Sequence, residues 1–231
     1  MDDNKVSSRW WVVFGAILIQ LCLGAIYAWS VFTPELQLQG WTKLQTQIVF
    51  AVGLVSFAIV MVFAGGKLQS WGPRKLVIIG GLTLGSGYLL AGFLGGIHFW
   101  GTLLGIGVIG GMGIGLGYVV PIAVGMRLFP DHKGMITGLA VAGFGFGAMA
   151  WVKLAGNWGN LLDTIGLGNT FLVYGLAYAG LILLGSIWMK FPPADWKPDG
   201  YQLPNQTAGA GGEEFATKDM LCTPQFYLIF F

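Results

Sequence analysis

The sequence predicts an all-α membrane protein whose body is a bundle of six transmembrane helices. Hydrophobic residues fill 55 % of the 231 positions and charged residues only 10 %, whereas a soluble domain carries about 25 % charged residues. Most of the protein surface therefore cannot face water. A run of about 20 apolar residues crosses the hydrocarbon core of a bilayer as a helix. Six such runs are present, at residues 10–33, 45–66, 76–97, 99–126, 134–152 and 170–190.

The first run starts at Trp10 and is longer than the apolar region of a signal peptide, and no small-residue cleavage site follows it. We therefore expect it to remain as a membrane span. Its segment GAIYAWSVF places two large aromatic residues in the outer half of the span. Trp29 can be interpreted as a membrane-interface aromatic, whereas Tyr27 lies deeper and is the better candidate to face a cavity.

The fourth run contains the glycine-rich stretch GIGVIGGMGIGLGYVVP, residues 105–121. Its first six letters match the dinucleotide fingerprint G-x-G-x-x-G, but that motif requires a strand, a tight turn and a helix start. An uncharged run over residues 99–126 leaves no room for such a unit. The glycines instead form small-x-x-x-small rows, which let helix backbones approach closely. One row is Gly107, Gly111 and Gly115, and another is Gly113 and Gly117.

Two further residues of this run are candidates for a functional role. Pro121 removes one helical hydrogen bond and predicts a bend. Tyr118 precedes it by about one turn and has two interpretations. Its ring either packs against neighbouring helices with its hydroxyl on a backbone carbonyl, or its hydroxyl faces a substrate cavity.

The fifth run repeats the glycine spacing in the segment GLAVAGFGFGAMAW. Gly143 and Gly147 are four residues apart, and Phe144 and Phe146 lie between them. Phe144 is close to the middle of the span. Core packing and the wall of a cavity are both open as the role of either phenylalanine.

The distribution of Lys and Arg predicts the orientation, because cytoplasmic loops are enriched in these residues. With the N-terminus in the cytoplasm, ten of the 12 Lys and Arg residues fall on the inner side. Only Lys43 and Lys153 fall on the outer side. We therefore expect a multi-pass protein of the plasma membrane with a cytoplasmic N-terminus.

Residues 1–190 form the predicted six-helix domain, and a different composition follows them. Residues 191–225 are rich in Pro, Gly and charge, and we expect a cytoplasmic linker there. Residues 226–231 become apolar again and predict the start of a seventh helix. Six helices, a linker and a further span fit one half of a twelve-helix transporter, with each half built from inverted three-helix repeats.

The charge inventory excludes several classes of function. No span carries Asp, Glu, Lys, Arg or His near its middle, so we expect no metal site, no cofactor and no enzyme centre within the membrane. A channel would show a filter or a charge ring, and none is visible. The net charge of +2 without a basic cluster argues against nucleic acid as a partner. Cys22 and Cys222 are expected to stay unpaired.

One loop motif resembles a known family. The segment GGKLQSWGPRK, residues 65–75, is similar to the signature between helices two and three of the major facilitator superfamily. That signature has an Asp, then a Gly three residues later, then basic residues. Gln69 stands at the Asp position, and Gly72, Arg74 and Lys75 match the others. In the family the carboxylate locks the outward-facing state, so the resemblance implies a weaker lock with Gln69.

The segments from Gly111 to Gly147 resemble helices four and five of one subgroup, the oxalate/formate antiporters and bacterial monocarboxylate transporters. The shared pattern is aromatic-x-x-Pro, then Arg, Phe-Pro-Asp and Lys-Gly. GAIYAWSVF, PPADWKPDGY and TPQFYLIFF are also similar. The resemblance implies alternating-access transport of small carboxylates such as lactate in a bacterial inner membrane. Proton symport and anion exchange with oxalate and formate are both open, and the other transporter half is the implied partner.

The same resemblance implies a set of site residues. Tyr27, Tyr118 and Phe144 correspond to cavity residues of helices one, four and five. Phe144 stands where some members carry Tyr, which favours a monocarboxylate with an apolar end over a dianion. The charged binding and coupling residues are expected in the other half of the transporter.

The turn between the fourth and fifth runs reads MRLFPDHKG and carries Arg127, Asp131 and Lys133. These residues are either anchors that follow the positive-inside bias or parts of a gate. In the second interpretation they close the inner mouth through ion pairs with residues 65–75. His132 is expected to be exposed.

Overall fold

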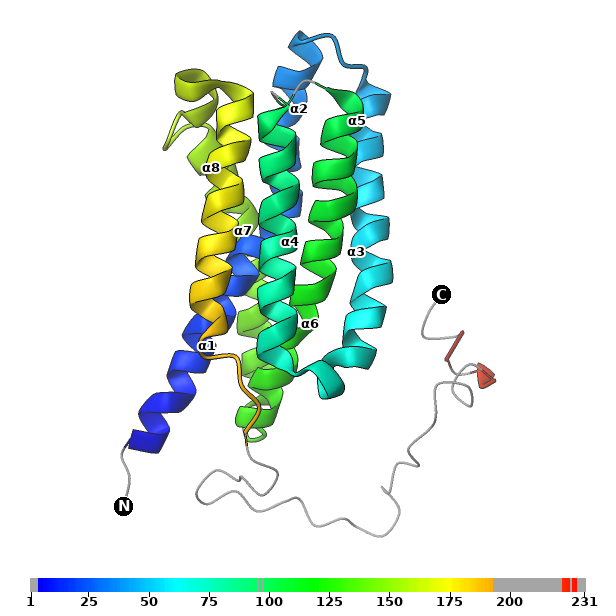
Figure 1. Ribbon diagram of the computed structural model, residues 1–231. Coiled ribbons are helices and arrows are strands. Elements are labelled where there is room, and N and C mark those ends of the chain that lie inside the picture. Colours follow the sequence, from blue (N-terminus) through cyan, green and yellow to red (C-terminus); the bar gives the residue numbers. More distant parts are fainter. Residues whose placement is uncertain (1–3, 95, 97, 193–221, 225, 228–231) are drawn as a thin grey trace. The chain divides into compact units, whose positions relative to one another are not determined.

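The computed structural model describes residues 4–94, 96, 98–192, 222–224 and 226–227, with side chains from Arg9 onward. All regular structure among these residues is helical (Figure 1), which confirms the predicted all-α class. Residues 1–198 form one compact unit and residues 199–231 a second one. The expected linker lies mostly outside the described residues, as do residues 228–231 of the expected seventh helix.

Within the described residues, six helical segments are long and apolar enough to cross a membrane. They are Arg9–Leu38, Lys43–Trp71, Pro73–Phe93, Phe99–Leu128, Lys133–Ala155 and Leu161–Ser186. The sixth segment begins well before the expected residue 170. Asp163 and Asn169 make its first turns too polar for an apolar count, and Gly166, with φ of 77°, kinks the helix between them.

Two of the spans combine an α-helix with another type of helix. The first consists of α1 (Asn4–Leu23), the 3₁₀ segment η1 (Gly24–Ala28) and α2 (Trp29–Leu38). The fourth consists of α5 (Phe99–Thr102), the π-helical segment η2 (Leu103–Gly110) and α6 (Gly111–Leu128). The other spans are α3 (Lys43–Trp71), α4 (Pro73–Phe93), α7 (Lys133–Ala155) and α8 (Leu161–Ser186). A tightened or widened turn re-aims the side chains that follow it.

Local sequence explains where α3 starts and stops. Thr42 and Gln45 form a capping box, in which the Gln45 backbone N–H donates to Thr42 Oγ1 at 3.2 Å and the Thr42 backbone N–H donates to Gln45 Oε1 at 2.9 Å. At the other end Gly72 has φ of 79°, a left-handed conformation that favours glycine. Pro73 then supplies the first position of α4. Gly72 therefore allows an immediate reversal between two antiparallel helices.

The glycine-rich fourth span packs against α3 along the row that was expected from its spacing. A Cβ atom on Gly111 would lie 2.5 Å from the Gly53 carbonyl oxygen, and one on Gly115 would lie 2.7 Å from the Phe57 carbonyl oxygen. These separations are shorter than side chains tolerate, so the two backbones are in direct contact. The packing interpretation of this row is confirmed.

The second expected row divides between two neighbours. A Cβ on Gly113 would lie 2.7 Å from the Gly80 carbonyl oxygen of α4, whereas one on Gly117 would lie 3.1 Å from the Leu23 side chain of α1. The fourth span thus touches three other spans through glycines. In Figure 1, α4 lies beside α8. It also contacts α6, so it links the sixth span to the fourth.

Aromatic side chains fill the space where α4, α7 and α8 meet. Tyr88, Tyr174 and Tyr178 are fully or almost fully buried there. The Tyr174 hydroxyl donates a hydrogen bond of 2.5 Å to the Trp151 carbonyl oxygen, which joins α8 to α7. Trp151 and Phe144 are seven residues apart, so this buried packing lies on the same face of α7 as Phe144, about two turns away.

Candidate functional site

Three residues singled out by the sequence lie together although they come from three different spans. The ring of Phe144 on α7 contacts Tyr27 of η1, with 5.6 Å between ring centroids, and Tyr118 of α6, with 5.1 Å. Both contacts are edge-to-face, with interplanar angles of 87° and 76°, the arrangement that aromatic rings favour. Phe144 is therefore the centre of the group. The part of these residues in binding a substrate stays a prediction.

Two phenylalanines of α3 complete this group. The Phe50 ring lies 6.3 Å from that of Tyr27, and the Phe57 ring lies 5.4 Å from that of Tyr118. We call Tyr27, Phe50, Phe57, Tyr118 and Phe144 the aromatic cluster. Sequence reasoning missed the two phenylalanines. The apolar residues of the second span are spread all around the helix, so the pattern does not mark one side as buried.

The members of the aromatic cluster differ in exposure. Tyr27 is 47 % exposed, Tyr118 is partly buried and Phe144 is only 8 % exposed. Phe146, two residues further along α7, is 60 % exposed and points away from the cluster. Of the two phenylalanines that were open as cavity residues, Phe144 is thus the one that packs against the two tyrosines.

A hollow of about 360 Å³ adjoins the cluster at Tyr27 and Phe50. Its other lining residues are Trp29, Ser30, Thr33 and Gln47. The Ser30 hydroxyl donates to the Tyr27 carbonyl oxygen at 3.3 Å, and the Thr33 hydroxyl donates to the Trp29 carbonyl oxygen at 3.4 Å. Their oxygens can still accept hydrogen bonds. The hollow is therefore mainly apolar with a few polar groups, as small-ligand sites generally are.

The interpretation of Trp29 as a membrane-interface residue is wrong. Its side chain is only 4 % exposed, and its indole N–H donates to the Thr46 carbonyl oxygen at 2.9 Å. Trp29 thus ties the first span to the second inside the bundle. A tryptophan near the end of a span can lie at the membrane interface or inside the bundle, and the sequence pattern is the same in both cases.

Tyr118 matches the packing interpretation in its ring but not in its hydroxyl. Its ring packs against Phe57 and Phe144, as in a core residue. Among the described residues, however, no hydrogen bond occupies its hydroxyl group, so the expected bond to a backbone carbonyl is not present there. Pro121, which was expected to act in bending, is buried within α6.

Gln20 is a buried polar residue that the sequence reasoning did not single out. Its side chain is fully buried, and its Nε2 donates to the Tyr118 carbonyl oxygen at 3.5 Å. Its Oε1 has no hydrogen-bond partner among the described residues. A lone amide in the apolar run LIQLCL was the available signal, because such a group is costly to bury without partners.

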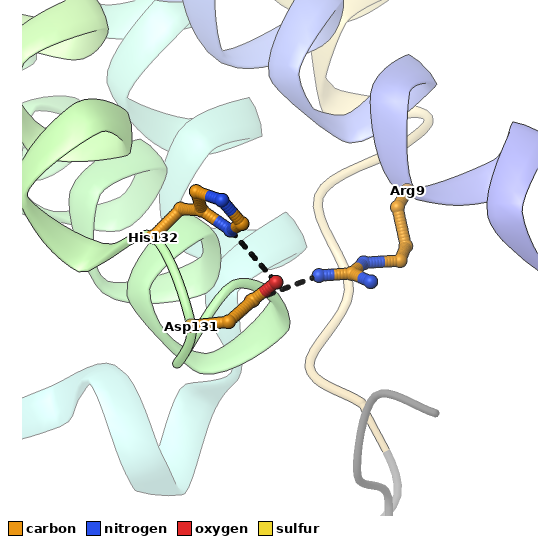
Figure 2. A network of polar contacts seen from close by, with 3 residues as sticks. All are labelled: Arg9, Asp131 and His132. Carbon is orange, nitrogen blue, oxygen red and sulfur yellow. Dashed lines mark hydrogen bonds and ion pairs between the residues drawn. The ribbon is translucent and has the colours of Figure 1, made fainter. Parts of the chain in front are cut away.

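A polar network lies where the first span meets the turn between α6 and α7 (Figure 2). Arg9 Nη2 lies 3.1 Å from Asp131 Oδ1, and His132 Nδ1 lies 2.7 Å from Asp131 Oδ2. Partial desolvation raises the pKa of the Asp131 carboxyl, but a backbone hydrogen bond, the His132 hydrogen bond and the charge of Arg9 outweigh it, so the pKa is lower than usual. His132 is exposed, as expected.

The partners of the α6–α7 turn differ from the expected ones. Asp131 pairs with Arg9 at the start of the first span rather than with residues 65–75. The Arg127 guanidinium lies over the ring of Phe191, 4.0 Å from its centroid. Lys133 is exposed. An arginine at residue 9 is distant in sequence from this turn, so no local pattern could indicate the pairing.

The signature loop is exposed at the same end of the bundle. Gln69, Arg74 and Lys75 are all solvent-accessible, and Lys75 Nζ lies 5.5 Å from the centroid of Trp71. Gly72 forms the reversal between α3 and α4. In the described part of the chain, no group of three or more His, Cys, Asp or Glu residues could hold a metal ion.

Comparison with known proteins gives the family. Residues 10–231 match the Major Facilitator Superfamily. The chain belongs to this superfamily. Its members are transporters, which accords with the six membrane-span helices of the described residues. The architecture is that of the N-terminal half of a major facilitator fold.

The similar curated proteins point in the same direction. The chain is 27 % identical over 98 % of its length to the uncharacterized MFS-type transporter YhjX of Escherichia coli. It is 25 % identical over 99 % of its length to the oxalate:formate antiporter of Oxalobacter formigenes. It is 29 % identical over 62 % of its length to the apicoplast pyruvate carrier 1 of Toxoplasma gondii, of which it covers 33 %. The chain spans about half of the first two relatives, 54 % and 52 %.

Proposed function

We propose that this bundle is one half of an alternating-access carrier for small monocarboxylates, with lactate as the type substrate. The observation that carries the proposal is the convergence of Tyr27, Tyr118 and Phe144, with a mainly apolar hollow that adjoins the group at Tyr27. The superfamily and the carboxylate-transporting relatives support it. The carrier resides in a bacterial inner membrane with its N-terminus in the cytoplasm, as the Lys and Arg distribution predicts.

Each member of the cluster has a distinct part in this proposal. The Tyr118 hydroxyl donates a hydrogen bond to a carboxylate oxygen of the substrate. Tyr27 and Phe144 form an apolar wall for the other end of the substrate. Phe144 supplies no hydroxyl, so a small monocarboxylate with a methyl end fits this wall better than a dianion does.

The charge of the carboxylate requires a partner from outside the bundle. The described spans place no Lys, Arg or His beside the aromatic cluster. A buried anion without a counter-charge is costly. We therefore assign the charged binding group, and the carboxylate that couples transport to protons, to the other transporter half, which faces this bundle across the hollow.

Anion exchange is the second candidate function. The similarity to the oxalate:formate antiporter favours it. In that mode the carrier returns to its starting state only with a bound anion, and no proton is needed. The same cluster serves either mode, because the substrate carboxylate is common to both.

Counterflow in proteoliposomes tests the proposal. The complete carrier that contains this bundle is reconstituted with unlabelled lactate inside and labelled lactate, formate or oxalate outside. Transient accumulation of labelled lactate supports a lactate carrier, and its dependence on a pH gradient supports proton coupling. In a parallel preparation with unlabelled oxalate inside, accumulation of labelled oxalate and formate but not of labelled lactate supports the exchanger instead. Flux of all three without counterflow would contradict both candidates.

A further inference from the structure

A second hollow lies at the opposite end of the bundle from the aromatic cluster's hollow and shares no lining residue with it. It measures about 490 Å³ and is formed by the α3–α4 turn, the first two turns of α4 and the residues after α8. Its charged lining residues are Arg74, Lys75 and Lys190, and its apolar ones include Ile78, Ile79 and Met189. We call it the basic hollow. Transport as proposed above makes no use of it.

The charges of the basic hollow are all positive and have no described counter-ion. Within the described residues, no carboxylate lies within ion-pair distance of Arg74, Lys75 or Lys190. At this end of the bundle, the carboxylate of Asp131 already binds Arg9 and His132. Three exposed cations around one hollow repel one another unless an anion joins them.

The start of α4 adds to this imbalance. Helix N-termini carry a partial positive charge and favour acidic side chains, yet Arg74 and Lys75 occupy the first turn of this 21-residue helix. No side chain caps its first backbone N–H groups among the described residues. The helix start and the lysine after α8 therefore present positive charge to the same space.

The wall beneath these cations is apolar. Ile78 and Ile79 are partly exposed and continue along α4 from Lys75, about one turn deeper. Trp71 and Phe191 close the hollow on its two sides. A free inorganic anion would gain nothing from this wall. A molecule with an anionic head and a hydrocarbon tail matches both parts at once.

We propose that the basic hollow binds an anionic phospholipid, with the phosphate between Arg74, Lys75 and Lys190 and an acyl chain along Ile78 and Ile79. Basic pockets between transmembrane helices are suited to phospholipid headgroups. Such a lipid bridges the α3–α4 turn and the residues that follow α8. It would hold the signature loop at the membrane interface.

Native mass spectrometry of the purified full chain tests the proposal with phosphatidylglycerol as the probe. Phosphatidylcholine, which has no net charge, and inorganic phosphate are the comparison ligands. Phosphatidylglycerol should bind in preference to phosphatidylcholine, and millimolar phosphate should not displace it. Equal binding of the two lipids would overturn the proposal, and displacement by phosphate would assign the hollow to a soluble anion.

A pair of matched double variants locates the binding. Lys75→Gln with Lys190→Gln should weaken phosphatidylglycerol binding by roughly 10- to 30-fold, from the loss of two lysine charges near a lipid surface. Lys67→Gln with Lys133→Gln removes the same charge from exposed positions outside the hollow, and should change binding less than about twofold. Equal weakening in both would overturn the site.

A charge-conserving variant guards against a folding defect. Lys75→Arg with Lys190→Arg keeps both positive charges and should retain binding close to that of the unchanged chain. Loss of binding in this variant, with helical circular dichroism intact, would show that charge at these positions does not hold the lipid. Retained binding together with loss in the glutamine variant supports the assignment.

Discussion

The rings of Tyr118 and Phe144 meet edge to face, with 5.1 Å between their centroids, and so join α6 to α7 beside the first span. This contact fixes the tyrosine ring without occupying its hydroxyl. A phenol held in this way can bind a ligand without first giving up an internal hydrogen bond. Two predictions follow from this pair of residues.

Tyr118→Phe in the complete carrier should raise the half-saturation constant for lactate and leave the maximal rate nearly unchanged. A hydrogen bond to a charged group contributes about 1.5–3 kcal/mol, so the constant should rise roughly tenfold or more. Uptake of labelled lactate into proteoliposomes measures both values. Tyr174→Phe is the control, because that hydroxyl serves the Trp151 carbonyl instead. Unchanged uptake in Tyr118→Phe would remove Tyr118 from the site.

Phe144→Tyr should shift the preference of the carrier from lactate toward oxalate. The new hydroxyl would lie between Tyr27 and Tyr118 and would offer a second carboxylate a donor, a gain of a few-fold for a hydrogen bond of about 1 kcal/mol. Competition of unlabelled oxalate against labelled lactate reports the shift. Phe146→Tyr adds the same hydroxyl to an exposed position on the same helix and should leave the ratio unchanged. An equal shift in both variants would contradict the assigned position of the wall.

Gly111→Ala should destabilise the bundle by about 1–3 kcal/mol, the usual cost of overpacking a tight contact. The added Cβ would lie 2.5 Å from the Gly53 carbonyl oxygen, so α3 and α6 must move apart. Thermal unfolding of the purified chain in detergent measures the effect. Gly180→Ala on α8 is the control, since nothing lies within 4 Å of its new Cβ. A similar loss in both variants would show that helix contact is not the cause.

Asp131→Asn should lower stability at neutral pH by at most about 1 kcal/mol, because exposed ion pairs contribute little. The pKa of Asp131 is lower in the folded chain than its ordinary value of 3.8. The stabilisation is therefore complete above that ordinary value and is lost as the pH falls through the folded value. Unfolding measured from neutral to acidic pH should show the two chains converging only at the acidic end.

Asp163→Asn is the control for this pH dependence. Asp163 is exposed at the start of α8 and forms no ion pair with a described residue. Its substitution should stay within about 0.5 kcal/mol of the unchanged chain. A difference between wild type and Asp131→Asn that persists below the folded pKa would contradict the ion-pair explanation.

Much of the fold follows from composition and spacing alone. Six apolar runs predict six membrane helices because lipid offers the backbone no other partner. The row Gly107, Gly111 and Gly115 predicts a close helix contact, although it does not say that the neighbour is α3. The 3₁₀ and π-helical segments have no such signal, because they arise from packing between spans rather than from local residue preference.

The candidate site, too, could be predicted only in part from the sequence. Their places in the spans and then the family resemblance brought Tyr27, Tyr118 and Phe144 into consideration, and only the fold places their rings against one another. Phe50 and Phe57 stayed hidden in a uniformly apolar run. Arg9 could not be matched with Asp131, because their meeting depends on how the first span lies against the α6–α7 turn.

The glycine contacts of the fourth span limit which substitutions the protein can accept as it evolves. Where two backbones touch, every alternative residue is larger than the one present, so no exchange of one side chain for another can be neutral there. A saturation screen of this chain should find its least tolerant positions among residues that carry no chemistry of their own. A new substrate preference would therefore evolve through substitutions in the aromatic cluster, while the glycines of the fourth span stay unchanged.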